Sequence, residues 1–186
     1  TRSISIDTNR SYEASHITIE GDATAASYAA SLACIHRGQV KFTNLGSNTR
    51  QGDYRFFEVL ERLGAEVTRD QTSTLIRGPS RLTTFKSIDM QDMPDVALTL
   101  IALAPLLNEE LSISGLSSLH HKECDRLECP ADEMQKMGIG VTTNSDSIRI
   151  QPASLDELRD HLLTTYHDHR MAMAFSVLGS KTGLIT

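Results

Sequence analysis

The chain has 186 residues, enough for roughly one to one and a half ordinary domains with a core that needs neither disulfides nor a structural metal. Its composition, 39% hydrophobic and 23% charged residues, is that of a globular protein and excludes a disordered tail, a collagen-like repeat and a coiled coil. The net charge of −6 argues against non-specific nucleic-acid binding, because no domain-wide basic face is available to contact phosphates.

The sequence shows no sign of a membrane segment or of secretion. No apolar run approaches the roughly 20 residues that a spanning helix needs, and residues 1–10 lack the apolar core of a signal peptide. The three cysteines, Cys34, Cys124 and Cys129, are odd in number and lie in patterns typical of helices. We therefore expect free thiols in a reducing compartment, and the cytoplasm is the predicted location.

An internal repeat is the most informative feature of the sequence. Asp22, Asp95 and Asp168 stand 73 residues apart, and each precedes a segment with almost no polar face. Asp is a preferred N-cap residue, so the pattern predicts three helices that begin directly after these positions. A helix that is apolar all round must be buried on all sides. We expect the three helices to run parallel and to pack around an approximate threefold axis, with their N-termini gathered at one end.

Each apolar helix belongs to a longer unit, which we read as β-α-β-α-β-β. A short alternating run follows the first two helices, at residues 39–42 and 111–114, and a charged amphipathic segment follows each run. Gly64 and Gly138 end these amphipathic segments at equivalent positions, as is typical of a helix C′ residue.

The repeat predicts an α/β (α+β) fold in which residues 1–186 form a single, partial domain. The expected units cover about 16–79, 87–152 and an incomplete 162–186. Because the third unit stops early and the first residue is not Met, we expect a fragment of a longer protein.

The first candidate for chemistry is the charged segment that the pattern places at the start of the second helix of the second unit. Glu123 and Arg126 are three residues apart and would share a helix face. Charged first turns are usually solvated caps and local ion pairs, and this interpretation stays open. His120, His121 and Cys124 could suggest a metal, but no second ligand pair follows at a standard spacing, so none is expected.

The second candidate is the run His167-Asp168-His169-Arg170. Arg170 would enter an otherwise apolar helix, where an unpaired charge is costly, so it needs an anionic partner. That partner is either a bound ligand or a carboxylate such as Asp168. Asp95 follows Pro94, which marks a helix boundary, so a simple N-cap explains Asp95 and is compatible with a catalytic role.

Five motifs in a fixed order resemble the 5-enolpyruvylshikimate-3-phosphate synthase (3-phosphoshikimate 1-carboxyvinyltransferase) family. They are Glu20-Gly21-Asp22-Ala23 with Ser27-Tyr28, Gln51-Gly52-Asp53 with Arg55-Phe56, Met93-Pro94-Asp95, Lys122-Glu123-Cys124-Asp125-Arg126, and Tyr166-His167-Asp168-His169-Arg170-Met171-Ala172-Met173. The match is collinear from about Ile17 to Leu178. The sister enzymes that act on UDP-N-acetylglucosamine share the architecture but do not resemble the last two motifs.

The resemblance implies a two-domain enolpyruvyl transferase, with three β-α-β-α-β-β units in each domain and the active site in the cleft between them. This chain would be most of one domain, and the partner domain would lie outside it. The implied reaction transfers the enolpyruvyl group from phosphoenolpyruvate to the 5-hydroxyl of shikimate 3-phosphate and releases phosphate, in aromatic amino-acid biosynthesis. It uses no metal or organic cofactor, and this chain alone would hold half of the active site.

By the same resemblance, Asp95, Lys122 and Glu123 are the expected catalytic residues. Asp95 would accept hydrogen bonds from the shikimate hydroxyls and is a candidate base for the attacking one. Lys122 would share that proton transfer. Glu123 would deliver a proton to the methylene carbon of phosphoenolpyruvate and later remove one, since addition to an enol ether needs an acid at carbon and a base at oxygen.

The expected substrate-binding residues are Arg126, Arg170, His169 and Ser118. The two guanidinium groups would hold the carboxylate or phosphate of phosphoenolpyruvate bidentately, with His169 beside them. Ser118 stands where the family usually has Asn, so one contact to shikimate 3-phosphate differs. Pro130 falls within the second helix of the second unit and should kink that helix or shift its start.

Two alternatives remain on the sequence alone. The chain could be a non-catalytic interaction or scaffold module derived from the same fold, with a partner at its missing edge. It could also belong to a different enolpyruvyl transferase, which would bind a uridine nucleotide instead of shikimate 3-phosphate.

Overall fold

The computed structural model describes residues 3–9 and 11–183. The helices are α1 (Ala23–Ile35), α2 (Phe56–Arg62), α3 (Ala97–Leu103), α4 (Glu128–Lys136) and α5 (His169–Thr182). The strands are β1 (Gln39–Phe42), β2 (Glu66–Arg69), β3 (Thr74–Arg77), β4 (Ser87–Asp89), β5 (Leu111–Ser114), β6 (Val141–Asn144) and β7 (Ser147–Ile150). The α/β (α+β) class is confirmed, and across the described ranges none of the helices has the length and apolar character of a membrane span.

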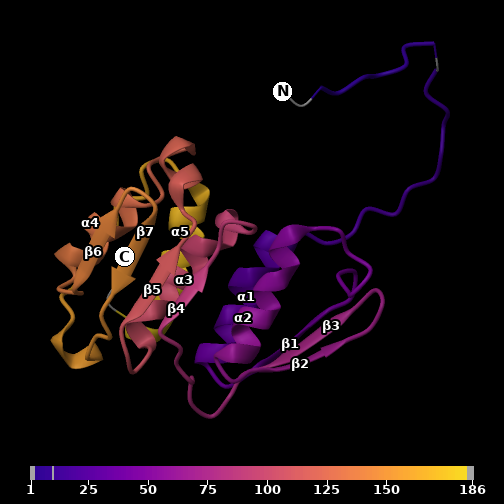
Figure 1. The fold of residues 1–186 in the computed structure, drawn as a ribbon. Coiled ribbons are helices and arrows are strands. Elements are labelled where there is room, and N and C mark those ends of the chain that lie inside the picture. The colour runs from indigo at the N-terminus through magenta and orange to yellow at the C-terminus, as the bar shows by residue number, and fades with distance from the viewer. Residues whose placement is uncertain (1–2, 10, 184–186) are drawn as a thin grey trace.

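Two small sheets lie on either side of the central helices (Figure 1). One is antiparallel with the order β1-β3-β2, and the other has the order β4-β5-β7-β6 with β4 parallel to β5. In both halves a helix, a strand, a second helix and a two-stranded hairpin follow one another. The threefold arrangement of such units stays a prediction.

The first half lacks the opening strand that the repeat predicted near residue 16. Residues 11–20 form no ladder, and Ile17 and Ile19 are 79% and 83% exposed. Figure 1 shows this segment leading away from the body of the molecule before α1 begins, so its backbone has no strand to pair with. In the second half β4 pairs with β5, whereas within the described residues β1 has a ladder partner on one side only.

The three central helices α1, α3 and α5 pack against one another and run in the same direction. Ser27 Oγ lies 2.9 Å from Thr99 Oγ1, near the start of α1 and of α3. At the other end, His36 Nε2 lies 2.9 Å from Ser180 Oγ, just after α1 and near the end of α5. The parallel packing predicted from the apolar sequences is therefore present, and the three N-termini lie at one end of the domain.

Two of the three repeated aspartates cap their helices as predicted. Asp22 Oδ1 accepts hydrogen bonds from the amides of Thr24 and Ala25, at 2.8 and 3.1 Å. Asp168 Oδ1 accepts one from the amide of Arg170 at 2.8 Å. The capping prediction for Asp95 is wrong. A short 3-10 turn, η2 (Pro94–Val96), precedes α3 and already contains Asp95, so the N-cap position of this turn falls on Met93.

The segment from Lys122 to Arg126 does not open a helix, contrary to the prediction. It forms an irregular stretch after the 3-10 turn η4 (Ser117–His121), and α4 begins at Glu128. Asp125 Oδ1 accepts hydrogen bonds from the amides of residues 127 and 128 and thereby sets the start of the helix. Pro130 lies in the first turn, where its missing N–H costs nothing, in line with the expected shift of the helix start.

Candidate active site

Arg126 is the centre of a charged network at the N-terminal end of the central helices. Its side chain is 2% exposed and contacts three carboxylates. Nε donates to Asp168 Oδ2 at 2.7 Å, Nη1 to Asp95 Oδ1 at 3.3 Å and Nη2 to Glu123 Oε2 at 2.5 Å. Arg126 thus joins η2, the irregular segment before α4 and the start of α5.

Asp95 is the second junction of the network. Its carboxylate lies 2.9 Å from Lys122 Nζ, 3.3 Å from Arg126 Nη1 and 3.6 Å from Arg170 Nη2. Burial alone would raise the pKa of Asp95. The hydrogen bond from Lys122 and the charges of the two arginines together lower the pKa by more than burial raises it, so the net shift is downward. Asp95 is therefore ionised at neutral pH and can accept hydrogen bonds.

Arg170 differs from Arg126 in having donors without acceptors. Its side chain is 17% exposed, and both Nε and Nη1 are buried with no hydrogen-bond partner in the described part of the chain. Tyr28 of α1 lies beside Arg170 and forms a hydrogen bond with it. Burial raises the pKa of the Tyr28 hydroxyl, and the charge and hydrogen bond of Arg170 partly offset that rise. A buried guanidinium with two nitrogens that lack an acceptor is prepared to bind an anion.

Asp168 is the most deeply buried carboxylate of the network. It is fully buried, and its pKa is lowered because the hydrogen bonds from Arg126 and from the Arg170 amide outweigh the effect of burial. Cys124 Sγ also donates to Asp168 at 3.4 Å. Burial is the main cause that raises the pKa of Cys124 to about 12, so this thiol is a neutral donor and not a nucleophile.

The structure brings together five of the seven predicted site residues, namely Asp95, Lys122, Glu123, Arg126 and Arg170. It leaves His169 and Ser118 outside the network. His169 is 69% exposed, with its Nδ1 3.9 Å from Asp168 Oδ1. Ser118 is exposed on η4.

Sequence reasoning missed two contributors, and each carried a usable signal. The sequence predicts Asp168 as a helix cap or a partner of Arg170, and its position before a buried helix is the signal for the further pair with Arg126. Tyr28 belongs to one of the five motifs and lies in the first half of the apolar helix α1, which is the signal that it neighbours the site. His120 Nδ1 lies 2.8 Å from Asp125 Oδ2, and Cys124 Sγ donates to Asp168 Oδ2. Among the described residues, no three His, Cys, Asp or Glu side chains are grouped as metal ligands.

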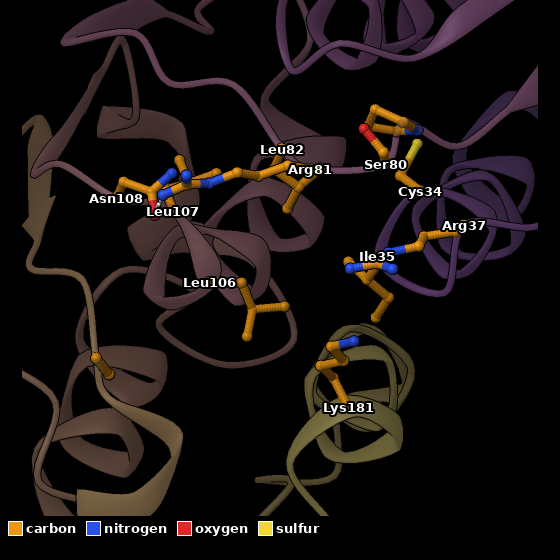
Figure 2. Close-up of a pocket in the computed structure, with 12 residues that line it drawn as sticks. Cys34, Ile35, Arg37, Ser80, Arg81, Leu82, Leu106, Leu107, Asn108 and Lys181 are labelled. Atoms are coloured by element: carbon orange, nitrogen blue, oxygen red, sulfur yellow. Dashed lines mark hydrogen bonds between the residues drawn. The ribbon is translucent and has the colours of Figure 1, made fainter.

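A separate cavity of about 260 Å³ lies at the opposite, C-terminal end of the central helices. Figure 2 shows Arg37, Arg81 and Lys181 around it, with Arg81 reaching Asn108. Lysine and arginine side chains near helix C-termini offset the partial negative charge of the last carbonyl groups. This structural role explains the cations, so we place the candidate active site at the N-terminal end.

Known proteins include sequences that are similar to this chain. A protein-family model described as EPSP synthase (3-phosphoshikimate 1-carboxyvinyltransferase) matches residues 1–185. The 3-phosphoshikimate 1-carboxyvinyltransferase of Trichormus variabilis is 36% identical over 177 residues, covering 95% of this chain and 41% of the relative. That of Haemophilus influenzae is 38% identical over 168 residues, covering 90% and 38%.

Solved structures give the same result. EPSP synthase from Acinetobacter baumannii matches with a TM-score of 0.69 and 27% identity, over 88% of this chain and 40% of that one. The enolpyruvyl transferase NikO from Streptomyces tendae matches with a TM-score of 0.60 and 13% identity, over 91% and 38%, which shows a shared fold alone. The chain spans about two fifths of the length of the curated relatives it matches. It belongs to the EPSP synthase (3-phosphoshikimate 1-carboxyvinyltransferase) family.

Proposed function

We propose that this chain supplies half of the active site of an enzyme that transfers the enolpyruvyl group from phosphoenolpyruvate to the 5-hydroxyl of shikimate 3-phosphate. The observation that carries the proposal is the buried guanidinium of Arg170, whose Nε and Nη1 have no acceptor in the described residues. Leaving such donors unpaired is costly, whereas a carboxylate or phosphate can accept two hydrogen bonds from one guanidinium. Phosphoenolpyruvate offers both groups.

The neighbouring residues suit the two proton transfers of this reaction. Asp95 is ionised and accepts the proton of the attacking hydroxyl, while Lys122, 2.9 Å from Asp95, holds the oxygen as it gains charge. Glu123 is 52% exposed, so it can take up a proton from solvent when the substrates bind, and in that protonated form it adds the proton to the methylene carbon of phosphoenolpyruvate. The hydroxyl oxygen then bonds to the central carbon, and loss of phosphate with return of the added proton restores the double bond.

The charge balance supports the proposal that further residues come from a second domain. Three cations, Lys122, Arg126 and Arg170, face three carboxylates, Asp95, Glu123 and Asp168, so this network is close to neutral. Two phosphorylated substrates bring several negative charges that need additional cations. We infer that a domain outside this chain supplies them and closes over the site, which excludes water. The predicted cytoplasmic location fits such an enzyme.

The direct test is phosphate release from phosphoenolpyruvate plus shikimate 3-phosphate. The purified chain is assayed alone and with the complementary domain of the Haemophilus influenzae relative added in trans. We expect no release by the chain alone and clear release by the mixture. Absence of release from a mixture whose halves demonstrably associate would contradict the proposal and favour the non-catalytic interaction module.

A substitution tests the role of Glu123 within the mixture. Glu123→Gln keeps the size and the contact with Arg126 but removes the transferable proton, so turnover should fall at least about 100-fold. Glu128→Gln, an exposed substitution at the start of α4, is the matched control and should leave turnover unchanged. Equal turnover of the Glu123→Gln variant and the unmodified protein would remove Glu123 from the mechanism.

A further inference from the structure

A second buried carboxylate, Glu133 of α4, lies outside the network described above. Its side chain is fully buried, and four donors converge on its two oxygens. Oε1 accepts from Lys136 Nζ at 2.6 Å and from Tyr166 Oη at 2.8 Å. Oε2 is 2.6 Å from His161 Nε2 and accepts from the Thr164 amide at 3.0 Å.

Three of these four contacts come from one segment, residues 161–166, which leads directly into α5. Between β7 and α5 the chain forms a short 3-10 turn, η5 (Leu155–Glu157), and an isolated bridge residue at His161, but no helix or strand. A segment without secondary structure must be fixed by side-chain contacts if the residues that follow are to have a defined position. Glu133 provides several such contacts at a single point.

The turn between this segment and α5 has an unusual backbone. Tyr166 and His167 have φ angles of 54° and 58°, in the left-handed region that residues with a Cβ rarely adopt. Two such residues in succession persist only when the surroundings hold them. The hydroxyl of Tyr166 is bound to Glu133, so the contact that fixes the segment also holds the first residue of the strained turn.

The residues directly after the turn belong to the candidate active site. Asp168 binds Arg126, and Arg170 has two guanidinium nitrogens, Nε and Nη1, without an acceptor in the described residues. We propose that Glu133 is a positioning residue, which holds residues 161–167 in place so that Arg170 is presented to phosphoenolpyruvate. The role in substrate binding rests on the function proposed above, whereas the structural part can be tested without substrate.

The first experiment measures amide hydrogen exchange in the purified chain and in its Glu133→Gln variant. Glutamine has the same size, but its amide presents one acceptor and one donor to a site where four donors meet. We expect exchange of the amides of residues 161–168 to accelerate at least about tenfold, with β6 and β7 unchanged. Unchanged exchange in 161–168 would overturn the proposal.

The second experiment measures steady-state kinetics of the chain assembled with the complementary domain. The Glu133→Gln variant should raise KM for phosphoenolpyruvate about tenfold and leave KM for shikimate 3-phosphate within about twofold, because Arg170 is displaced and Lys122 is not. A general loss of stability would lower the amount of active enzyme without separating the two KM values. An equal rise in both KM values, or in neither, would overturn the proposal.

A rescue variant and a control sharpen the result. His167→Gly places at the strained turn a residue that adopts positive φ without steric cost, so adding it to Glu133→Gln should restore KM for phosphoenolpyruvate to within about threefold of the original. Lys136→Met removes the one contact that does not come from the 161–166 segment and should leave KM unchanged. Failure of the rescue would contradict the part of the proposal that involves the turn.

The two proposals can fail separately. If the assembled enzyme with unmodified Glu133 shows no transfer, the proposed function is wrong, while the exchange experiment still decides whether Glu133 holds the segment. If the assembled enzyme is active and the Glu133→Gln variant matches it in exchange and in both KM values, only the positioning role is wrong.

Discussion

Asp168 and Glu133 are both fully buried carboxylates, but their surroundings differ in one respect. Around Glu133 every donor has its acceptor, and four donors share two oxygens. Around Asp168 the acceptors are also occupied, yet the adjacent Arg170 has two buried guanidinium nitrogens without an acceptor in the described residues. A carboxylate whose hydrogen-bond partners are all present stabilises the structure around it. Buried donors without an acceptor instead indicate a site where an anionic ligand can bind.

Replacing Arg126 should have the largest effect on stability. Arg126→Met leaves Asp168 buried without its main cation, and breaking a buried pair in this way costs about 3–5 kcal/mol of unfolding free energy. Urea titration followed by circular dichroism measures the change. Arg55→Met is the control, because the pair of Arg55 with Asp92 is exposed and should contribute little. A loss as small as that of the control would show that Asp168 does not depend on Arg126.

The Glu133 cluster should make the fold sensitive to acid. Burial would raise the pKa of Glu133, but its hydrogen bonds outweigh burial and lower the pKa from 4.5 to about 2. Because the pKa is lower in the folded state, this contribution, about 3 kcal/mol, is complete above pH 4.5 and is lost as the pH falls toward 2.

Glu133→Gln should remove that share of the pH dependence. The measurement is the urea midpoint of both proteins at about pH 6 and about pH 3, where only the unmodified protein should lose roughly 2 kcal/mol of the Glu133 contribution. Parallel losses in the two proteins would assign the acid sensitivity to other carboxylates, such as Asp95 and Asp168, whose pKa values are also lowered.

A smaller loss should follow removal of one donor from the saturated cluster. Tyr166→Phe deletes the hydroxyl that binds Glu133 and should cost about 1.5–3 kcal/mol, as expected for a hydrogen bond to a charged group. Tyr12→Phe removes the same atom from an exposed position in the N-terminal segment and should have no effect. Equal unfolding free energies for the two variants would mean that Glu133 is held by its other contacts alone.

Replacing Arg170 should change stability least. Arg170→Met removes two nitrogen donors without an acceptor in the described residues, a contact of 3.6 Å to Asp95 and the hydrogen bond with Tyr28. Because the two unpaired donors are costly to bury, their removal offsets the lost contacts, and the unfolding free energy should stay within about 1 kcal/mol. The same variant should abolish phosphate release in the assembled enzyme. A destabilisation as large as that of Arg126→Met would show that Arg170 has a structural role and would remove the contrast between the two clusters.

The sequence was sufficient where local rules act alone. The alternating runs coincide with β1 and β5, and Gly64 and Gly138 have φ angles of 98° and 91°, as predicted for helix C′ residues. The five charged residues that the resemblance selected do meet in space. These successes depend on periodicity, on glycine and on motif order, all of which are visible in one chain.

The failures arise where a tertiary contact competes with a local preference. Asp95 is a good capping residue by type, but three nearby cations attract its carboxylate and Pro94 starts the turn one residue earlier. Glu133 lies in the charged amphipathic segment that ends at Gly138, and Met137, four residues later on the same helix face, belongs to the core. A carboxylate on the apolar face was the available signal, but its partners in residues 161–166 could not be inferred from spacing.

The open edge of β1 has a consequence for handling the chain in isolation. Edge strands expose backbone N–H and C=O groups that can template pairing with another molecule and start aggregation. Lys41 is exposed in the middle of β1, and a charge at such a position acts as a gatekeeper against fibril growth. Lys41→Val would remove this protection. Although valine has the higher strand propensity, we expect the variant to be less soluble than the unmodified chain.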